Sequence, residues 1–219
     1  DITYLQGLPS TSGSRLFADF VPDHDSEMVA RYRAAGLVIF GKTNTPEFGA
    51  GSQTFNEVFG ETRNPYDVTK TCGGSSGGAA VALACGMTPL ADGSDMGGSL
   101  RNPASFCNVV GLRPSPGRVP SWPSNLGWST LSVDGPMART VADVALMLAA
   151  LAGPDARSPI AINEESSKFL QPLERDFKNT KIAWVNFGLH FQREVKETVD
   201  AQRKIFEDLG CIVEDAEPD

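Results

Sequence analysis

The chain has 219 residues and a formal net charge of -8, a length that fits one large domain or two small ones. Its 41% hydrophobic and 21% charged residues are ordinary for a globular protein and exclude the disordered and fibrous classes. The acidic balance argues against nucleic-acid binding, which concentrates Lys and Arg on one face.

The cysteine, histidine and hydropathy patterns narrow the class further. The four cysteines are Cys72, Cys85, Cys107 and Cys211. They show no CxxC or Cys/His ligand spacing, so we expect no zinc site. No apolar run approaches the roughly 18 residues that span a bilayer, and no charged-then-apolar leader opens the chain. We therefore expect a cytoplasmic protein with reduced cysteines and no membrane association.

Both ends of the sequence favour a longer polypeptide. The first residue is Asp1 rather than Met, and the last segment is acidic and contains Pro218 without a closing element. We expect the chain to continue in both directions.

The first predicted elements are a helix and a strand. Asp25-Ser26 precedes a helix-like stretch over residues 27–35 that stops at Gly36. The apolar run at residues 37–40 predicts a short buried strand. Residues 41–78 are rich in Gly, Asn, Pro, Ser and Thr, which indicates a long loop of the kind that carries function.

Two further helices are predicted in the middle of the chain. Small helix formers at residues 79–85 end at Gly86, so the Gly-Ser-rich segment before them lies at a helix N-terminus. Residues 106–112 are apolar enough for buried structure. Thr140 with Asp143 predicts the cap of an almost wholly apolar helix over residues 141–151, buried on most of its surface.

The last third of the chain indicates the fold class. Residues 154–180 have little pattern and are typical of a linker or a surface excursion. Residues 181–187 predict a strand, apolar residues at helical spacing follow from 195 to 209, and residues 211–213 predict another strand. A strand, helix and strand of this length form a parallel crossover, so the class is α/β.

One motif suggests a different chemistry. Gly36 to Thr43 matches the letters of a phosphate-binding P-loop. In a real P-loop, however, a Gly-rich turn lies between a strand and a helix, whereas the four residues between the glycines here form the apolar strand itself. Pro46 also opposes a helix directly after Thr43. We therefore reject nucleotide binding.

Two Gly-Ser clusters are the strongest functional signal. They are Gly73-Gly-Ser-Ser-Gly-Gly78 and Asp92-Gly-Ser-Asp-Met-Gly-Gly-Ser-Leu-Arg-Asn-Pro103. A lone cluster of this kind is usually a flexible turn, but two close clusters joined to apolar structure favour a site. N–H groups in the turn at Met96, Gly97, Gly98 and Ser99 can converge on an oxyanion, and Ser99 can attack a carbonyl once a base removes its proton.

With these clusters the chain resembles the amidase signature family. The matching blocks include the opening Asp-Ile, Gly41-Lys-Thr-Asn-Thr-Pro-Glu-Phe48, Gly60-Glu-Thr-Arg-Asn-Pro65, both Gly-Ser clusters, Phe106-Cys-Asn-Val-Val-Gly-Leu-Arg-Pro114, Gly117-Arg-Val119 and Gly135-Pro-Met-Ala-Arg139. The resemblance covers residues 1–153 almost continuously and residues 181–215 more variably.

The resemblance implies an α/β fold with a mixed, largely parallel sheet covered by helices. It makes residues 1–219 a partial amidase signature domain. Within it, residues 1–153 are the signature core, 154–180 a variable surface excursion, and 181–219 a strand-helix-strand continuation.

The resemblance also implies a catalytic triad of Ser, Ser and Lys. The nucleophile maps onto Ser99, and the bridging serine, which normally follows a cis peptide bond, maps onto Ser75. The family's lysine precedes an aspartate that matches Asp1, so we expect the lysine just before residue 1. Among the lysines of the chain, Lys42 is the least unsuitable substitute. The reaction needs no metal or organic cofactor.

Other residues are candidates for support. We expect Asp95 and Arg101 to form an ion pair that braces the Ser99 turn, because buried charges need partners. Ser76 and Ser94 can add hydrogen bonds. Cys72 is either a packing residue or a thiol facing the pocket, and packing is favoured. His24 and His190 lie far from the Gly-Ser turns, so a Ser-His triad is not expected.

These inferences lead to one function and two alternatives. The first is a hydrolase of a linear or cyclic small-molecule amide that acts through a seryl acyl-enzyme, and a homodimer is compatible with it. The second is the A subunit of a tRNA-dependent amidotransferase, which would pass ammonia to another protein of its complex. The third, a non-catalytic binding protein of the same fold, is disfavoured because both serines are present.

Overall fold

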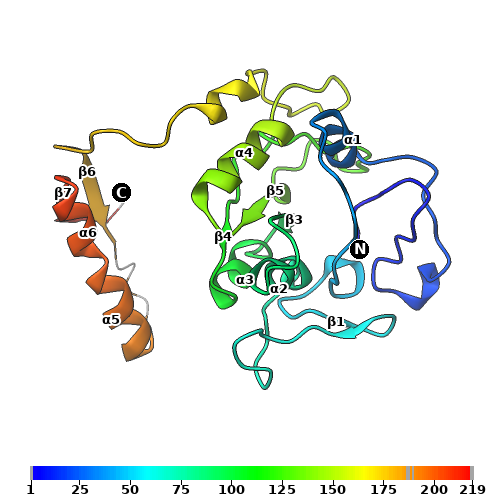
Figure 1. Ribbon diagram of the computed structural model, residues 1–219, viewed down its shortest axis with the longest axis horizontal. Helices are drawn as coiled ribbons and strands as arrows, with labels where there is room; N and C mark the ends of the chain where they lie inside the picture. Colours follow the sequence, from blue (N-terminus) through cyan, green and yellow to red (C-terminus); the bar gives the residue numbers. More distant parts are fainter. Residues whose placement is uncertain (1, 186–187, 189, 218–219) are drawn as a thin grey trace. The chain divides into compact units, whose positions relative to one another are not determined.

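The computed structural model describes residues 2–185, 188 and 190–217, and the chain divides into two units, Asp1–Gln171 and Pro172–Asp219. The first unit holds helices α1 to α4 and strands β1 to β5, and the second holds α5, α6, β6 and β7 (Figure 1). Both Gly-Ser clusters belong to the first unit.

Helix α1 (Glu27–Ala34) begins where the sequence predicts. The Ser26 hydroxyl accepts a hydrogen bond from the Val29 N–H and so satisfies one of the N–H groups that a helix start leaves open. The helix ends before Gly36, whose φ of +76° is the left-handed conformation that commonly terminates helices. A short 3-10 helix, η1 (Arg15–Phe17), precedes it.

The segment after α1 differs from the expected short buried strand. Residues 37–40 are in no helix or strand, and no described strand pairs with them. Val38 and Phe40 are 84% and 71% exposed. A strand requires a hydrogen-bonded neighbour, which an apolar run does not guarantee. The strand prediction at residues 37–40 is therefore wrong for the described chain.

The long loop at residues 41–78 contains only short regular elements before α2. Its 3-10 helix η2 covers Glu47–Gly49, and β1 (Phe55–Asn56) pairs with β2 (Gly60–Glu61) as a small antiparallel hairpin. The Asn56 side chain donates to Asn44 Oδ1 over 2.6 Å. Side-chain hydrogen bonds of this kind hold the loop where backbone ladders do not.

A three-stranded sheet with the order β3–β5–β4 lies at the centre of the first unit. Its strands and the helices that connect to them are α2 (Gly77–Ala84), β3 (Leu90–Asp95), α3 (Arg101–Phe106), β4 (Val110–Gly111) and β5 (Val133–Ala138). The first Gly-Ser cluster leads into α2, and the second extends from β3 through the following turn into α3.

The strand directions modify one expectation. The α/β class holds, but β3 and β4 both pair with β5 in antiparallel orientation, and the β1–β2 hairpin is antiparallel as well. The parallel pair among the described strands is β6–β7. The largely parallel sheet is therefore not seen in the described residues. The sequence indicated a helical crossover only at residues 181–213, where the parallel pair occurs.

Small residues allow α2 to pack tightly into the core. The core cluster around it contains Cys72, Ala79, Ala80, Leu83, Leu100, Ala104, Cys107 and Met137. At Gly78 a Cβ atom would collide with the backbone of Asn44, so only glycine allows this approach. The run of glycine and alanine thus sets how close α2 lies to the loop before it.

Helix α4 (Val141–Leu151) has the bounds and the cap that the sequence predicts. The Thr140 hydroxyl accepts from the Asp143 N–H over 3.1 Å. One face of the helix packs into a second core cluster of Met28, Tyr32, Val119, Met147, Leu148, Leu151 and Ala152. Leu146 on another face is 56% exposed, so burial is less extensive than expected. The 3-10 helix η3 (Ser166–Leu170) follows.

The second unit confirms the predicted strand, helix and strand. Strand β6 (Lys181–Trp184) pairs in parallel with β7 (Ile212–Asp215), and the connection contains α5 (Arg193–Ala201) and α6 (Arg203–Asp208). The expected strand over residues 181–187 ends earlier, and residues 186 and 187 lie outside the described residues.

All four cysteines are free, and Cys72 and Cys107 are buried. Within the described part of the chain, no helix combines the length and hydropathy that a bilayer crossing requires.

The core predicts the outcome of two leucine substitutions. Leu83 on α2 is fully buried, so Leu83→Ala should lower the free energy of unfolding by about 2–5 kcal/mol through lost burial and a residual cavity. Leu146→Ala, at an exposed helical position, should change it by less than about 0.5 kcal/mol. Urea unfolding followed by circular dichroism measures both values. Equal losses would contradict this assignment of the core.

Candidate active site

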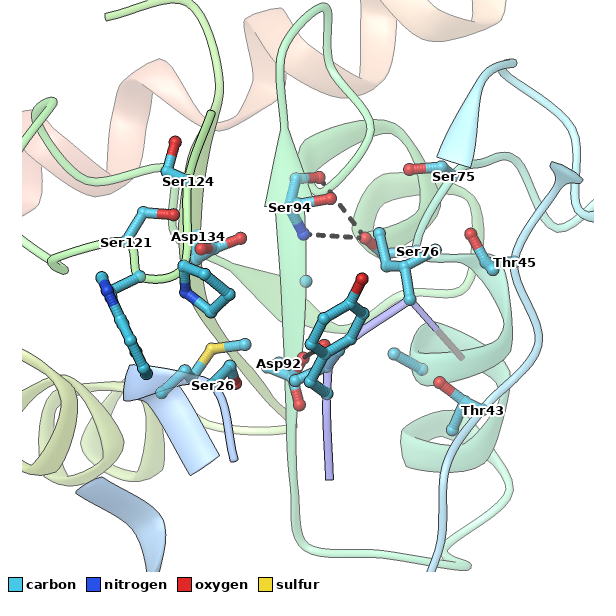
Figure 2. Close-up of a pocket in the computed structure, with 18 of the residues that line it drawn as sticks. Ser26, Thr43, Thr45, Ser75, Ser76, Asp92, Ser94, Ser121, Ser124 and Asp134 are labelled. Atoms are coloured by element: carbon cyan, nitrogen blue, oxygen red, sulfur yellow. Dashed lines mark hydrogen bonds between the residues drawn. The ribbon is translucent and has the colours of Figure 1, made fainter. Parts of the chain in front are cut away.

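A cavity of about 520 Å³ lies beside the two Gly-Ser clusters (Figure 2). Its lining comes from residues 2–4, 43–45, 75–76, 92–94 and 120–125, together with Ser26, Met28, Ala79 and Asp134. Segments that are distant in sequence therefore meet around one space. Most of its polar side chains are hydroxyls and carboxylates, which accept hydrogen bonds.

Ser75 lies at this cavity just before α2. The residue is only 3% exposed, and the Gly74–Ser75 peptide bond is cis, as the family resemblance implies. A Cβ atom on Gly74 would lie 2.7 Å from the Gln53 backbone nitrogen, so glycine is required at that position. The backbone around Ser75 is therefore closely confined.

Hydrogen bonds join the two Gly-Ser clusters. The Ser76 hydroxyl accepts from the Ser94 N–H over 3.2 Å and donates to the Ser94 carbonyl over 3.4 Å (Figure 2). The Ser76 N–H donates to the Ser99 carbonyl over 3.0 Å. The expected hydrogen bonding of Ser76 and Ser94 is thus confirmed, and the segment after Ser75 lies against Ser99.

The hydroxyl groups of Ser75 and Ser99 do not bond to each other directly. Within the described chain no hydrogen bond joins them, and Ser99 is outside the residues that line the cavity. Catalytic hydrogen bonds commonly shorten only when substrate is bound. The structure thus brings the two backbone segments together without forming the hydroxyl contact.

Asp95 organises the turn that carries Ser99. Its side chain is fully buried and accepts from the Gly98 N–H over 2.9 Å and from the Arg101 guanidinium over 2.9 and 3.0 Å. Burial alone would raise its pKa, but these hydrogen bonds and the Arg101 charge hold the pKa well below its usual range. The predicted Asp95–Arg101 ion pair is therefore confirmed.

This arrangement reduces the number of N–H groups that are candidates for oxyanion donors. The Gly98 N–H already donates to Asp95, so it is not available to a substrate. The N–H groups of Met96, Gly97 and Ser99 have no acceptor among the described residues. Gly98 instead has a conformational role, because its φ is +110° and a Cβ atom would lie 2.8 Å from Asn102 Nδ2.

A second arginine at Asp95 was not expected from the sequence. Arg113 Nη1 lies 3.0 Å from Asp95 Oδ1 and also donates to the Asp95 backbone carbonyl. Arg113 is 18 residues further along the chain, and spacing alone does not reveal such a contact. The sequence signal that could have drawn attention to Arg113 was its position in the Gly-Leu-Arg-Pro segment, which matches the family.

Two carboxylates in the cavity were not expected either. Asp92 pairs with Pro136 and Ser94 with Asp134 across β3 and β5, so Asp92, Ser94 and Asp134 share one face of the sheet. Burial and the nearby Asp92 charge raise the pKa of Asp134 to about 6. The alternation of polar residues along β3 was the available sequence signal.

Lys42 contacts a different part of the chain from Ser75. Its ammonium group donates to the Pro9 carbonyl over 3.0 Å and to the Ser10 hydroxyl over 2.5 Å. It lines a neighbouring cavity of about 570 Å³ that does not include Ser75. Burial lowers the Lys42 pKa to about 8, although the Asp92 charge opposes this shift. These surroundings do not support Lys42 as the base of a relay through Ser75.

In the described part of the chain, the hydrogen bonds of Cys72 and His24 do not involve the hydroxyl groups of Ser75 or Ser99. Cys72 is fully buried in the core, and burial raises the pKa of its thiol, as the packing interpretation predicts. His24 Nδ1 lies 2.7 Å from Asp23, and the His24 ring contacts the rings of Tyr4 and Trp122. Among the described residues, no group of three or more His, Cys, Asp or Glu side chains could hold a metal ion.

The fold and this Gly-Ser site define the amidase class, and comparison with known proteins agrees. A model of the Amidase family matches residues 1–219, so the chain belongs to that family. It aligns with a bacterial aryl acylamidase of the amidase signature enzymes with a TM-score of 0.91 at 33% identity, over 98% of this chain and 45% of that one. The amidase signature fold is thus confirmed.

Two sequence relatives are equally similar. An acylamidase of Rhodococcus erythropolis is 40% identical over all of this chain and 46% of its own length. The A subunit of the glutamyl-tRNA(Gln) amidotransferase of Alkaliphilus metalliredigens is 40% identical over 96% of this chain and 43% of its own length. The chain therefore spans less than half the length of these curated relatives.

The Asp95 cluster predicts a pH-dependent effect of Asp95→Asn. At pH 7 the variant should lose about 1.5–3 kcal/mol of unfolding free energy, because the buried carboxylate that accepts charge-assisted hydrogen bonds from both arginines is lost. The pKa of Asp95 is lower in the folded state, so its contribution is complete above about pH 4 and declines as the pH falls further.

Urea unfolding at pH 7, 5 and 3.5 tests this expectation. The difference from the unsubstituted protein should stay constant between pH 7 and 5 and become smaller at pH 3.5. Asp19→Asn, at an exposed aspartate, serves as the control. A difference that is independent of pH, or absent at pH 7, would show that Asp95 does not bind the arginines as a carboxylate.

Proposed function

We propose that this chain forms the catalytic core of a serine amidase that hydrolyses the carbon–nitrogen bond of a small-molecule amide. The observation that carries the proposal is the Met96–Ser99 turn. Asp95 holds it from within the protein, three of its N–H groups have no acceptor in the described chain, and its carbonyl at Ser99 bonds to the residue after Ser75. Acyl transfer needs a hydroxyl nucleophile and N–H donors that stabilise the oxyanion, and this turn offers both kinds of group.

In the first step, Ser99 Oγ attacks the amide carbonyl carbon. A bond forms between Oγ and that carbon, and the π electron pair moves to the carbonyl oxygen. The N–H groups of Met96, Gly97 and Ser99 stabilise the resulting negative charge. The Ser99 proton passes to Ser75 Oγ as the Ser75 proton passes to a base.

We further propose a lysine immediately before residue 1 as that base. Asp1, which would form the Lys-Asp pair, lies outside the described residues. The cavity at Ser75 supports the proposal because it offers the oxygens of Ser75, Ser76 and Ser94 to an amine, together with those of Asp92 and Asp134. The described residues that line this cavity include no Lys or Arg, so none of them places a positive charge beside these oxygens.

The second half of the reaction reverses the proton path. The oxyanion collapses to a carbonyl, the carbon–nitrogen bond breaks, and the relay protonates the departing amine. Water then attacks the acyl-enzyme, transfers a proton into the relay, and releases the carboxylic acid and the Ser99 hydroxyl. In this mechanism the protein contributes two serine hydroxyls, the amine of the proposed lysine and the backbone N–H groups of the turn.

The amidotransferase A subunit is the second candidate, because relatives with that name are up to 43% identical to this chain, compared with 40% for the acylamidase. The Leu-Arg-Asn-Pro after Ser99 and the Arg-Pro-Ser-Pro-Gly at residues 113–117 favour a general amidase. Glutaminase activity together with copurifying partner proteins would support the amidotransferase. Hydrolysis of small amides without partners would support the amidase.

The central prediction concerns Ser99. In a polypeptide that includes the upstream lysine, a fluorophosphonate probe should label Ser99, and Ser99→Ala should lower amide turnover by several orders of magnitude. Mass spectrometry of the labelled peptide identifies the residue. Ser105→Ala, at an exposed serine of α3, should retain labelling and turnover. Labelling at Ser75 instead would overturn the assignment of the nucleophile.

A separate prediction concerns Ser75. Since a proton relay acts on the barrier rather than on ground-state affinity, Ser75→Ala should lower kcat by about 100-fold or more and leave KM within about threefold. Steady-state kinetics with Ser105→Ala as reference measures both constants. Normal kcat with a raised KM would make Ser75 a binding residue and exclude the relay.

A further inference from the structure

Arg113 contacts the Ser99 turn differently from Arg101. The Arg101 guanidinium binds the carboxylate of Asp95, and the Arg101 side chain is 54% exposed. The side chain of Arg113 is 23% exposed, and its Nη1 donates both to the carboxylate and to the backbone carbonyl of Asp95. Its Nη2 donates to the Leu131 carbonyl over 3.0 Å. One guanidinium therefore joins the end of β3 to the loop before β5.

The contact with the Asp95 carbonyl has a geometric consequence. The Asp95–Met96 peptide bond is not among the cis bonds of the described chain, so its carbonyl and the Met96 N–H point to opposite sides of the peptide unit. Holding the carbonyl against Arg113 therefore orients the Met96 N–H away from the guanidinium. That N–H has no acceptor among the described residues.

We propose that Arg113 is a positioning residue that aims the Met96 N–H at the developing oxyanion. This inference rests on the proposed amidase function. A preorganised donor stabilises the transition state because it needs no reorientation when charge develops. Arg113 does not touch the substrate in this proposal. Its planar fork holds the Asp95 carbonyl and the Leu131 carbonyl together, which fixes the peptide plane more firmly than a single ammonium would.

A purely structural role would give a different result. Neutralising the buried Asp95 carboxylate requires only positive charge, which lysine also supplies. Arg113→Lys keeps that charge but loses the fork. The control is Arg118→Lys, since the Arg118 side chain is 15% exposed and its guanidinium pairs with Glu164 rather than with the Ser99 turn.

The experiment uses the enzyme that includes the upstream lysine and compares these variants. Arg113→Lys should lower kcat by about 10- to 100-fold and leave KM within about threefold, because the donor acts on the transition state. Its affinity for a trifluoromethyl ketone, which forms a tetrahedral adduct with Ser99, should fall by a similar factor. Affinity for the product carboxylate should remain unchanged. Arg118→Lys should match the unsubstituted enzyme.

A second variant covers the case in which Arg113→Lys does not accumulate in folded form. Arg113→Ala should regain kcat when millimolar guanidinium is added, with no change in KM. Equal kcat for Arg113→Lys and Arg118→Lys, or parallel losses of ketone and carboxylate affinity, would overturn the inference while Ser99 labelling remained. Absence of Ser99 labelling in the unsubstituted enzyme would overturn the proposed function as well.

Discussion

The buried carboxylate of Asp95 is the interaction on which the site depends. It lies at the end of strand β3, receives the Gly98 N–H and binds two arginines that lie further along the chain. Removing a carboxylate from water is unfavourable unless hydrogen bonds replace the lost solvation. Because several of those bonds come from the turn and from α3, satisfying Asp95 also shapes the backbone that carries Ser99. The same hydrogen bonds therefore compensate the charge of Asp95 and fix the geometry of the turn.

The second constraint is the close approach of backbones that only glycine allows. Gly74 lies against the backbone near Gln53, and Gly78 against Asn44, so the loop at residues 41–78 packs directly on the start of α2. This packing places Ser76 where its N–H reaches the Ser99 carbonyl. The glycines that resemble flexible linkers in the sequence are therefore among the most confined residues of the fold.

The sequence predicted the helices and strands that are determined by residues close together in the chain. Helices α1 and α4 begin at Ser26 and Thr140 caps, and the parallel pair β6–β7 follows from its helical crossover. The parts that depend on distant partners were missed. An apolar run at residues 37–40 did not reveal that it has no described strand partner, and neither Arg113 at Asp95 nor Asp134 beside Asp92 could be inferred from spacing. The roles of Ser99 and Ser75 came from resemblance and stay proposals.

Strand β3 lies at the edge of its sheet, with β5 on one side and no described strand on the other. Unpaired N–H and carbonyl groups at such an edge can template pairing with another molecule, but on this edge the N–H and the carbonyl of Ser94 already bond to the Ser76 hydroxyl. Residues 37–40 line a cavity together with the start of β3, and they include the exposed side chains of Val38 and Phe40. Pairing of this edge with another strand is therefore confined to the part of β3 before Ser94.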